Sequence, residues 1–215
     1  KVVSNDSWGL IDTNGKEVLA PIYDDVGNYS EGVIDVEKDG KAGLWINGNF
    51  VEVDGAEKIW SFSDGENLTY AKNTDNKVGF IDRKGKWVIE AQFDKARAFH
   101  RGLAPVSSNG KEWGYVDESG KVVIDEKFDD AEVFSADDLA PVKLGKAWGF
   151  INLNGDLVIE AKYAITTKTF DFFSTVQKKG FYNGLARVGL KKKWGFINTK
   201  GELLNGTWYD NAENF

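Results

Sequence analysis

The chain has 215 residues and a formal net charge of -7 at pH 7, with 34 acidic and 27 basic residues. This balance argues against binding to a nucleic-acid backbone, which clustered positive charge drives, and against docking on an anionic membrane surface. No apolar run approaches the roughly 18 residues that could span a bilayer. Because the sequence contains no Cys, it excludes disulfides, thiolate catalysis and Cys-ligated metals. Its 24 glycines and 13% aromatic residues indicate a folded, turn-rich chain made of strands.

The chain is built from six similar units of roughly 35 residues. A glycine recurs at the same place in each unit, and the last interval contains an insertion at about 165–180. The glycines are Gly9, Gly43, Gly79, Gly114, Gly149 and Gly195. Four of them follow a tryptophan, namely Trp8, Trp113, Trp148 and Trp194, whereas Ala42 and Val78 stand before the other two. We therefore expect one repeat domain over residues 1–215, with units starting near Trp8, Ala42, Val78, Trp113, Trp148 and Trp194.

Each unit begins with two apolar runs joined by a short turn that contains glycine. In the most regular copy, at 111–146, these parts read WGYVD, ESGK and VVID. This pattern predicts a β-hairpin, and the Asp or Asn before the turn can bind backbone N–H groups two residues on. We expect the glycine after Trp to allow a bulge or a close backbone approach, and the Trp to pack against the next unit.

The third part of each unit follows an aromatic–acidic pair: Tyr23-Asp24, Phe93-Asp94, Phe128-Asp129 and Tyr209-Asp210. The recurrence of this pair predicts that its Asp serves a turn of the repeat. A polar linker then leads to another apolar run, such as GLAPV, in which Pro105 and Pro141 indicate an edge or a bulge. The runs are too short for helices, so the sequence predicts an antiparallel meander of three strands per unit.

The motif from Trp113 to Lys146, W-G-[FLY]-[IV]-[DN] followed by a Gly-Lys turn, an aromatic-Asp pair and F-x-x-G-L-A-x-V, resembles the WG repeat family, also called KWG repeats. The resemblance covers essentially the whole chain. It implies an all-β tandem-repeat domain of a bacterial protein, often surface-associated or secreted, with an interaction role. The family supplies no catalytic residues. The second unit departs most from the pattern, because it lacks Trp-Gly and has Ile46 where Asp is expected.

The start of the chain, KVVSNDS, resembles the close of a third strand. One interpretation is a closed, propeller-like ring, in which Val2 and Val3 complete the last unit beside Trp208 to Phe215 and remove exposed strand edges. The alternative is an open β-solenoid or superhelix cut within the array. Because the sequence lacks Met, we expect Lys1 to follow processing or an excision from a longer chain.

The sequence offers little catalytic chemistry. His100 is the single histidine, and we expect it to be an exposed loop residue without a nucleophile elbow nearby. The acidic stretch with Asp129, Asp130, Asp137 and Asp138 could supply oxygen ligands for calcium, but its spacing is not that of an EF-hand. We expect no cofactor and no metal. Lys191, Lys192 and Lys193 form the densest basic patch, and strand alternation would place at most two of them on one face, as in a solvated hairpin.

Aromatic residues outside the repeat pattern are the candidate ligand contacts. They are Trp45, Trp60, Trp87, Phe170, Phe172, Phe173 and Trp208, the three phenylalanines lying in the insertion. They could instead fill gaps left by the missing tryptophans. Loop insertions of repeat proteins often form the binding face, and flat rings suit sugars and peptides. The sequence thus predicts a non-catalytic protein- or glycan-binding module. The alternatives are a glycan hydrolase that uses two carboxylates and a structural spacer.

Overall fold

The computed structural model describes residues 1–166 and 179–212 and confirms an all-β chain. The single helical element in these ranges is a short 3-10 turn, η1 (Leu204–Gly206). The chain divides into two compact units. The first unit contains residues 1–99 with 118–120, and the second contains residues 100–117 with 121–215. The prediction of a single repeat domain stays a prediction.

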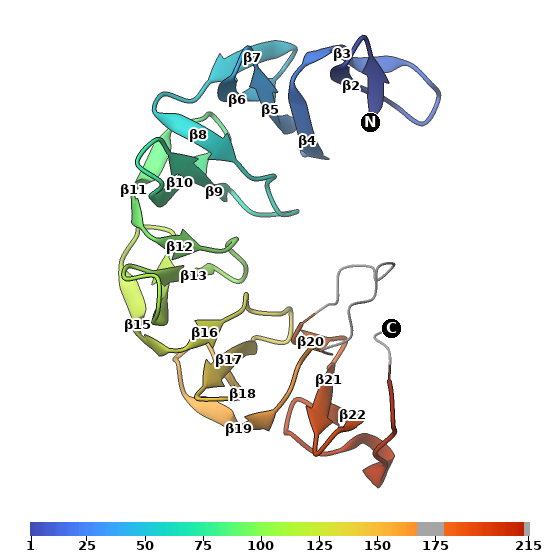
Figure 1. Cartoon of the computed structure of the whole chain (residues 1–215), viewed down its shortest axis with the longest axis vertical. Coiled ribbons are helices and arrows are strands. Elements are labelled where there is room, and N and C mark those ends of the chain that lie inside the picture. The colour runs from blue at the N-terminus through green and yellow to red at the C-terminus, as the bar shows by residue number, and fades with distance from the viewer. Residues whose placement is uncertain (167–178, 213–215) are drawn as a thin grey trace. The chain divides into compact units, whose positions relative to one another are not determined.

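Three small antiparallel sheets lie in the first unit (Figure 1). Sheet A has the order β1 (Val2–Ser4), β2 (Ser7–Ile11) and β3 (Glu17–Tyr23). Sheet B has the order β4 (Asp25–Ser30), β5 (Val33–Lys38), β6 (Lys41–Ile46) and β7 (Asn49–Glu52). Sheet C contains β8 (Ala56–Ile59), β9 (Leu68–Asn73), β10 (Val78–Asp82) and β11 (Trp87–Phe93), again paired in chain order.

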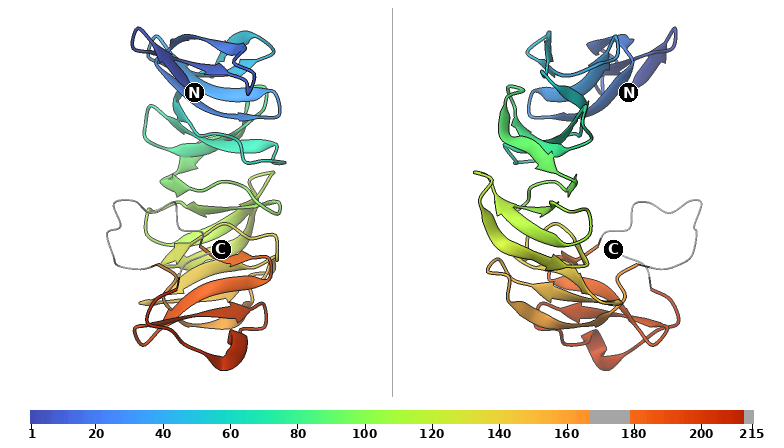
Figure 2. Two further views of the ribbon diagram at one scale, coloured as in Figure 1. Left: turned by 90° about the vertical axis from the view of Figure 1, so that its right-hand side faces the viewer. Right: turned by 60° about the vertical axis from the view of Figure 1, so that its left-hand side comes forward.

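Three further sheets follow along the chain, and Figure 2 shows each as a small twisted group of strands. Sheet D contains β12 (Lys95–Ala96), β13 (Leu103–Ser107), β14 (Trp113–Asp117) and β15 (Val122–Phe128). Sheet E contains β16 (Asp130–Ala131), β17 (Ala140–Leu144), β18 (Ala147–Ile151) and β19 (Leu157–Tyr163). Sheet F contains β20 (Phe181–Tyr182), β21 (Leu185–Leu190) and β22 (Lys193–Asn198).

The sheets are offset from the units seen in the sequence. The third run of each sequence unit pairs with the Trp-Gly strand of the next unit, as in the pairing of Val106 with Gly114. In sheets D and E, the residues directly after the aromatic–acidic pair add a two-residue strand. Sheets B to E therefore hold four strands instead of the expected three. Val2 pairs with Gly9, so β1 takes the place of a third run in sheet A.

The turns of the hairpins confirm the role expected for the Asp or Asn that precedes them. Asp82 accepts hydrogen bonds from the N–H groups of Lys84 at 2.8 Å and Lys86 at 2.9 Å through Oδ1. Asn152 makes the same two contacts with Asn154 and Asp156, both at 3.0 Å. The glycine of each turn lies in the left-handed region, with φ +80 at Gly85 and +83 at Gly155, where other residues are strained.

The glycine after Trp lies where a neighbouring backbone comes very close. A Cβ on Gly114 would meet the carbonyl oxygen of Ile124 at 2.4 Å, and the strand register shifts at this point. Trp113 beside it is buried in a core cluster with Phe128 and Ile124. In three units, the aromatic residue of the polar linker (Phe99, Phe134 or Phe181) packs on a ring of the strand that contains the repeat glycine. The ring centroids of Phe80 and Phe99, Tyr115 and Phe134, and Phe150 and Phe181 lie 4.7, 5.0 and 4.9 Å apart.

Candidate anion-binding site

Three of the candidate tryptophans pack into the protein. Trp87 lies against a core cluster of the first unit and donates a hydrogen bond from Nε1 to the carbonyl of Asp54 at 2.9 Å. Trp45 packs on the cluster that contains Leu19 and Ile34. Trp208 packs in the second unit and lies against Gly195, where an added Cβ would come within 3.1 Å of its ring. This packing gives each of the three a role in the fold.

Trp60 differs from these three, because its partners are amphipathic side chains. Its ring stacks on Tyr70 with a centroid separation of 4.5 Å and an interplanar angle of 17°, and the amine of Lys58 lies 5.3 Å from the ring centroid. Trp60 is half-buried. The remaining candidates, Phe170, Phe172 and Phe173, lie outside the described residues.

The acidic stretch of the fourth unit is used for internal contacts. Asp129 accepts from the N–H of Gly145 at 2.6 Å, Asp130 from Ala131, and Asp137 from Gly184, while Asp138 forms an ion pair with Arg101. Within residues 1–166 and 179–212, no group of three or more His, Asp or Glu is placed to hold a metal ion. His100 is half-buried instead of exposed, because its backbone pairs with Leu103 in a tight turn. Its Nδ1 atom is buried without a hydrogen-bond partner.

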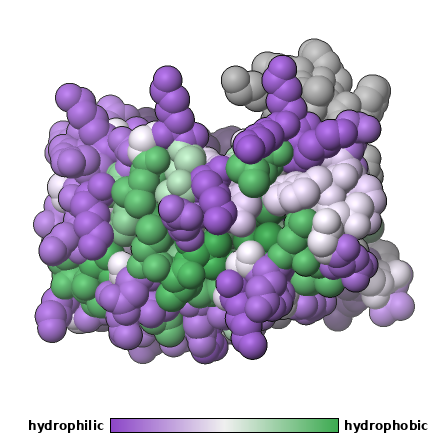
Figure 3. Space-filling view, turned by 90° about the horizontal axis from the view of Figure 1, so that it is seen from below, coloured by the Kyte–Doolittle hydropathy of each residue, from purple (hydrophilic) through white to green (hydrophobic). Residues whose placement is uncertain are grey.

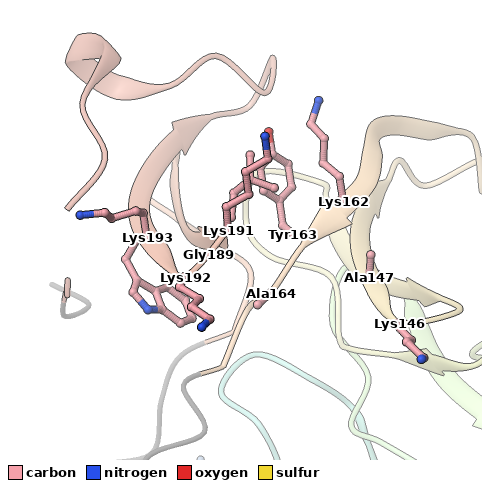
Figure 4. Close-up of a pocket in the computed structure, with 11 residues that line it drawn as sticks. Lys146, Ala147, Lys162, Tyr163, Ala164, Gly189, Lys191, Lys192 and Lys193 are labelled. Carbon is pink, nitrogen blue, oxygen red and sulfur yellow. The ribbon is translucent and has the colours of Figure 1, made fainter. Parts of the chain in front are cut away.

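A pocket of about 240 Å³ in the second unit gathers five exposed lysines (Figure 4). We call it the lysine pocket. Its lysines come from the turn between β17 and β18, from β19, and from the hairpin of β21 and β22. They are Lys146, Lys162, Lys191, Lys192 and Lys193. Lys193 pairs with Asp210 at 2.5 Å and Lys162 with Glu160 at 3.4 Å, whereas the other three have no ion-pair partner among the described residues.

Two alanines line the pocket at positions where the third and sixth units carry an ion pair. The residue before the Trp-Gly position and the Asp of the aromatic–acidic pair form the ion pair Lys77–Asp94 in the third unit. The sixth unit repeats this arrangement as Lys193–Asp210. In the fifth unit the two corresponding positions are Ala147 and Ala164, and both line the pocket. Both positions therefore present short side chains to the pocket.

The missing aspartate also removes an acceptor for the following turn. In sheets B and E this Asp accepts a hydrogen bond from a turn glycine, as Asp24 does from Gly40 N at 3.0 Å and Asp129 from Gly145 N at 2.6 Å. This confirms the turn role expected for Asp24 and Asp129. Ala164 keeps the same backbone position, because its N–H donates to the carbonyl of Gly189 at 2.8 Å. It has no carboxylate to offer, so no described residue supplies the acceptor to this turn.

The turn that faces this vacancy is built from two lysines. Lys191 and Lys192 have φ of +49 and +66, and their backbone N–H groups make no hydrogen bond within the described residues. Comparable two-residue turns in this chain use Asn5-Asp6, Asp39-Gly40 and Asn47-Gly48, which tolerate positive φ better. A left-handed conformation costs roughly 1–2 kcal/mol for a residue such as Lys. Strain of this kind gathers at functional sites, and here it presents two amines and two free amides.

The floor of the pocket is apolar but offers no open aromatic face. Tyr163 is buried beneath it, with the Lys162 amine 5.6 Å from its ring centroid. The guanidinium carbon of Arg187 lies 4.6 Å from the Trp194 ring centroid. The backbone of Gly189 packs on the same indole, because a Cβ there would lie 3.1 Å from its ring atoms. The lining contains no acid, thiol or hydroxyl nucleophile apart from the buried Tyr163, so the pocket is suited to binding an anion.

Sequence reasoning missed this site because it treated Lys191, Lys192 and Lys193 as successive strand residues. The structure places two of them in a turn and the third at the start of β22, so all three line one pocket. The signal that would have found it is the break in the aromatic–acidic pair, which in the fifth unit reads Tyr163-Ala164.

A second groove, of about 430 Å³ and confined to the first unit, is lined by carboxylates and two lysines. Its charged lining residues are Asp25, Asp35, Glu37, Glu57, Lys58 and Lys72. Burial raises the pKa of Asp35 above its ordinary value, although a hydrogen bond with Ser61 opposes this shift. The Oδ1 atom of Asp35 is buried without a hydrogen-bond partner.

Exposed apolar residues recur along the outermost strands. They include Val18, Val88, Val122, Val123, Leu157 and Val158, which open the second apolar run of their units. Figure 3 shows hydrophobic residues divided by hydrophilic ones over one face of the molecule. Because this exposure recurs from unit to unit, it belongs to the repeat and not to one specific site.

No helix of the described residues is long and apolar enough to span a membrane.

A model of the family described as WG containing repeat matches residues 8–41, 79–111, 113–146 and 148–164, more than half of the chain. A search of curated protein sequences finds no match. Among solved structures, the computationally designed Ika8 protein has a TM-score of 0.56 at 12% identity, over 93% of this chain and 67% of Ika8. Hsv2 of Kluyveromyces lactis has a TM-score of 0.49 at 11% identity, over 83% of this chain and 63% of that one. The WD40 beta propeller domain of Doa1 has a TM-score of 0.43 at 16% identity, over 88% of this chain and 69% of the Doa1 chain.

Proposed function

We propose that this chain, which belongs to the family of WG containing repeats, is a non-catalytic module that binds an acidic protein or glycan at the lysine pocket. One observation carries the proposal: Ala147 and Ala164 stand where two other units carry an ion pair, and they line an open pocket with three lysines that have no ion-pair partner within residues 1–166 and 179–212. Uncompensated charge costs stability through self-repulsion, and a ligand of opposite charge would relieve it. We also propose that the protein is secreted or lies on a bacterial cell surface.

The test is binding of the immobilised chain to a polyaspartate peptide, polygalacturonate and uncharged dextran at physiological salt. We expect saturable binding of an acidic probe and none of dextran. A triple variant, Lys146→Glu, Lys191→Glu and Lys192→Glu, should abolish binding. The control Lys16→Glu, Lys84→Glu and Lys121→Glu makes the same charge change at exposed lysines outside the pocket. Equal loss in both variants, or no binding of any acidic probe, would refute the proposal and leave the spacer interpretation.

Trp60 is a second candidate contact, and Phe172, which lies outside the described residues, is proposed separately from its place in the sequence insertion. An aromatic ring that stacks on Tyr70 and remains half-buried could rest against a sugar or a peptide. In the same assay, Trp60→Ala and Phe172→Ala should each reduce binding if these rings contact the ligand. Unchanged affinity in both variants would remove them from the binding surface.

The carboxylate groove of the first unit favours a second candidate function, hydrolysis of a glycan. Asp35 has the raised pKa that a general acid needs, and Asp25, Glu37 and Glu57 line the same groove. Incubation with a panel of polysaccharides should release new reducing ends, and Asp35→Asn should stop this release. If the wild-type chain releases none, the hydrolase candidate fails.

Closure of the array into a ring is proposed on the similarity of β1 to a third run, since Val2 and Val3 pair with β2 as such runs do elsewhere. The chain has no Cys, so introduced cysteines report without interference. A closed ring predicts a disulfide between Val3→Cys and Asn211→Cys in a monomer. An open array predicts none.

A further inference from the structure

We infer that the lysine pocket binds an aspartate or glutamate side chain from an extended acidic segment of a partner protein. This inference rests on the proposed function and specifies the ligand of the same site.

The first argument is that the repeat itself shows which group fits. In sheets B and E, the vacant position is filled by an aspartate carboxylate that accepts a hydrogen bond from a turn N–H, at 3.0 Å from Gly40 and 2.6 Å from Gly145. Sheet F keeps the backbone arrangement at Ala164, and the turn N–H groups of Lys191 and Lys192 make no hydrogen bond with any residue that the structure describes. A ligand carboxylate would restore the missing contact with a turn N–H beside the lysines of the same turn. Such charge-assisted hydrogen bonds are the strong ones.

The second argument is the way in which the carboxylate reaches this position. Asp24 and Asp129 each lie directly beside a strand and pair through the backbone, donating from N to the carbonyls of Glu37 and Lys143. An extended peptide presents its acidic side chains in the same manner. The other lysines lie on separate elements, Lys146 in a turn and Lys162 on β19, so neighbouring acidic residues of the same segment would find partners.

The third argument concerns size and shape, which favour a peptide over an acidic glycan. A volume of about 240 Å³ is below the usual range of ligand pockets, roughly 300–1,000 Å³, but is enough for one carboxylate side chain. Sugars are commonly held against an open aromatic face. The Trp194 ring is instead packed by Arg187 and Gly189, and Tyr163 is buried.

Ala164→Asp gives the sharpest test, because it returns the repeat's own carboxylate to the pocket. The probes are a decapeptide rich in Asp, the same peptide with Asn in place of Asp, and hexagalacturonate. The wild-type chain should bind the Asp peptide and neither of the others. Ala164→Asp should weaken the Asp peptide at least tenfold, whereas Ala164→Asn should weaken it by clearly less, since it fills similar space without charge. Thr166→Asp places the same charge two residues away, outside the pocket lining, and should change affinity less than threefold.

The outcomes separate this inference from the proposed function. Wild-type affinity in Ala164→Asp, measured on protein shown by circular dichroism to be folded, overturns the inferred position of the carboxylate. Binding of hexagalacturonate without the Asp peptide overturns the choice of a peptide, while the acidic-partner module stands. If neither probe binds and the polyanions of the first test also fail, both ideas fall. A tenfold loss of affinity for the Asp peptide in Ala164→Asp, without a comparable loss in Ala164→Asn or Thr166→Asp, supports the inference.

Discussion

Gly149 offers a direct test of the close strand approach in sheet E. A Cβ at this position would lie 2.6 Å from the carbonyl oxygen of Ile159 and 2.8 Å from the backbone N of Ala161. Both contacts are with backbone, so Gly149→Ala must push β18 and β19 apart at a point where their register already shifts. Overpacking of this kind costs about 1–3 kcal/mol. Removal of a glycine stiffens the unfolded chain and returns about 0.4–1 kcal/mol. The two terms leave an expected net loss of about 1–2 kcal/mol.

The assay is differential scanning calorimetry, in which about 2 kcal/mol corresponds to a decrease of about 4–8 °C in Tm for a chain of this size. The matched control is Gly195→Ala in the same compact unit. Its Cβ would meet side-chain atoms, Leu203 Cδ1 at 2.8 Å and Trp208 Cε3 at 3.1 Å, which can move. We expect a change of less than about 1.5 kcal/mol there. A Gly149→Ala variant that melts within 1 °C of the wild type, or a larger loss at Gly195, would refute the backbone argument.

Three further outcomes follow from other contacts. Asp129→Ala removes the 2.6 Å bond to the Gly145 N–H and should cost about 1 kcal/mol in urea unfolding; Asp125→Ala, at an exposed residue of β15 four positions earlier, should be neutral. Burial raises the pKa of Asp35 above its ordinary value, so the ionised form is disfavoured in the fold. The contribution of Asp35 to stability therefore becomes less favourable as pH rises from about 4 through the raised pKa. Asp35→Asn should therefore raise Tm at pH 7 and leave it unchanged at pH 3.5; an equal gain at both values would contradict this assignment. Trp87→Phe loses the bond to Asp54 and should lower the free energy of unfolding by about 1 kcal/mol, with an unchanged Tm as the refuting result.

The sequence predicts the local structure of this chain well, because local structure depends on residues close in the chain. The position of Asp82 before a glycine turn is enough to predict the hairpin and its side-chain contact. A glycine that recurs after Trp in a strand, such as Gly149, is enough to predict a close backbone approach, because only a residue without Cβ fits there. The fourth strand of sheets D and E is not predictable in this way. Pairs such as Lys95–Ala96 and Asp130–Ala131 are too short for any periodicity to show.

The candidate site is harder to predict because it depends on what is absent. Trp45, Trp87 and Trp208 attract attention as departures from the repeat, yet packing accounts for all three. Ala147 and Ala164 do not suggest a site from the sequence, because alanine is a common residue without a reactive or charged group. Their meaning appears only once the Lys77–Asp94 and Lys193–Asp210 pairs show what normally fills the position.

The offset between sequence unit and sheet has a practical consequence for dissecting the array. A cut immediately before Trp113 would separate β13 from β14, the strand with which it pairs, and leave two incomplete sheets. A cut after Asp129 would fall between sheet D and sheet E and leave sheet D with all four of its strands. The module that can be excised, transplanted or duplicated without dividing a sheet therefore runs from one aromatic–acidic pair to the next, and in sheet D Trp113 lies near its middle.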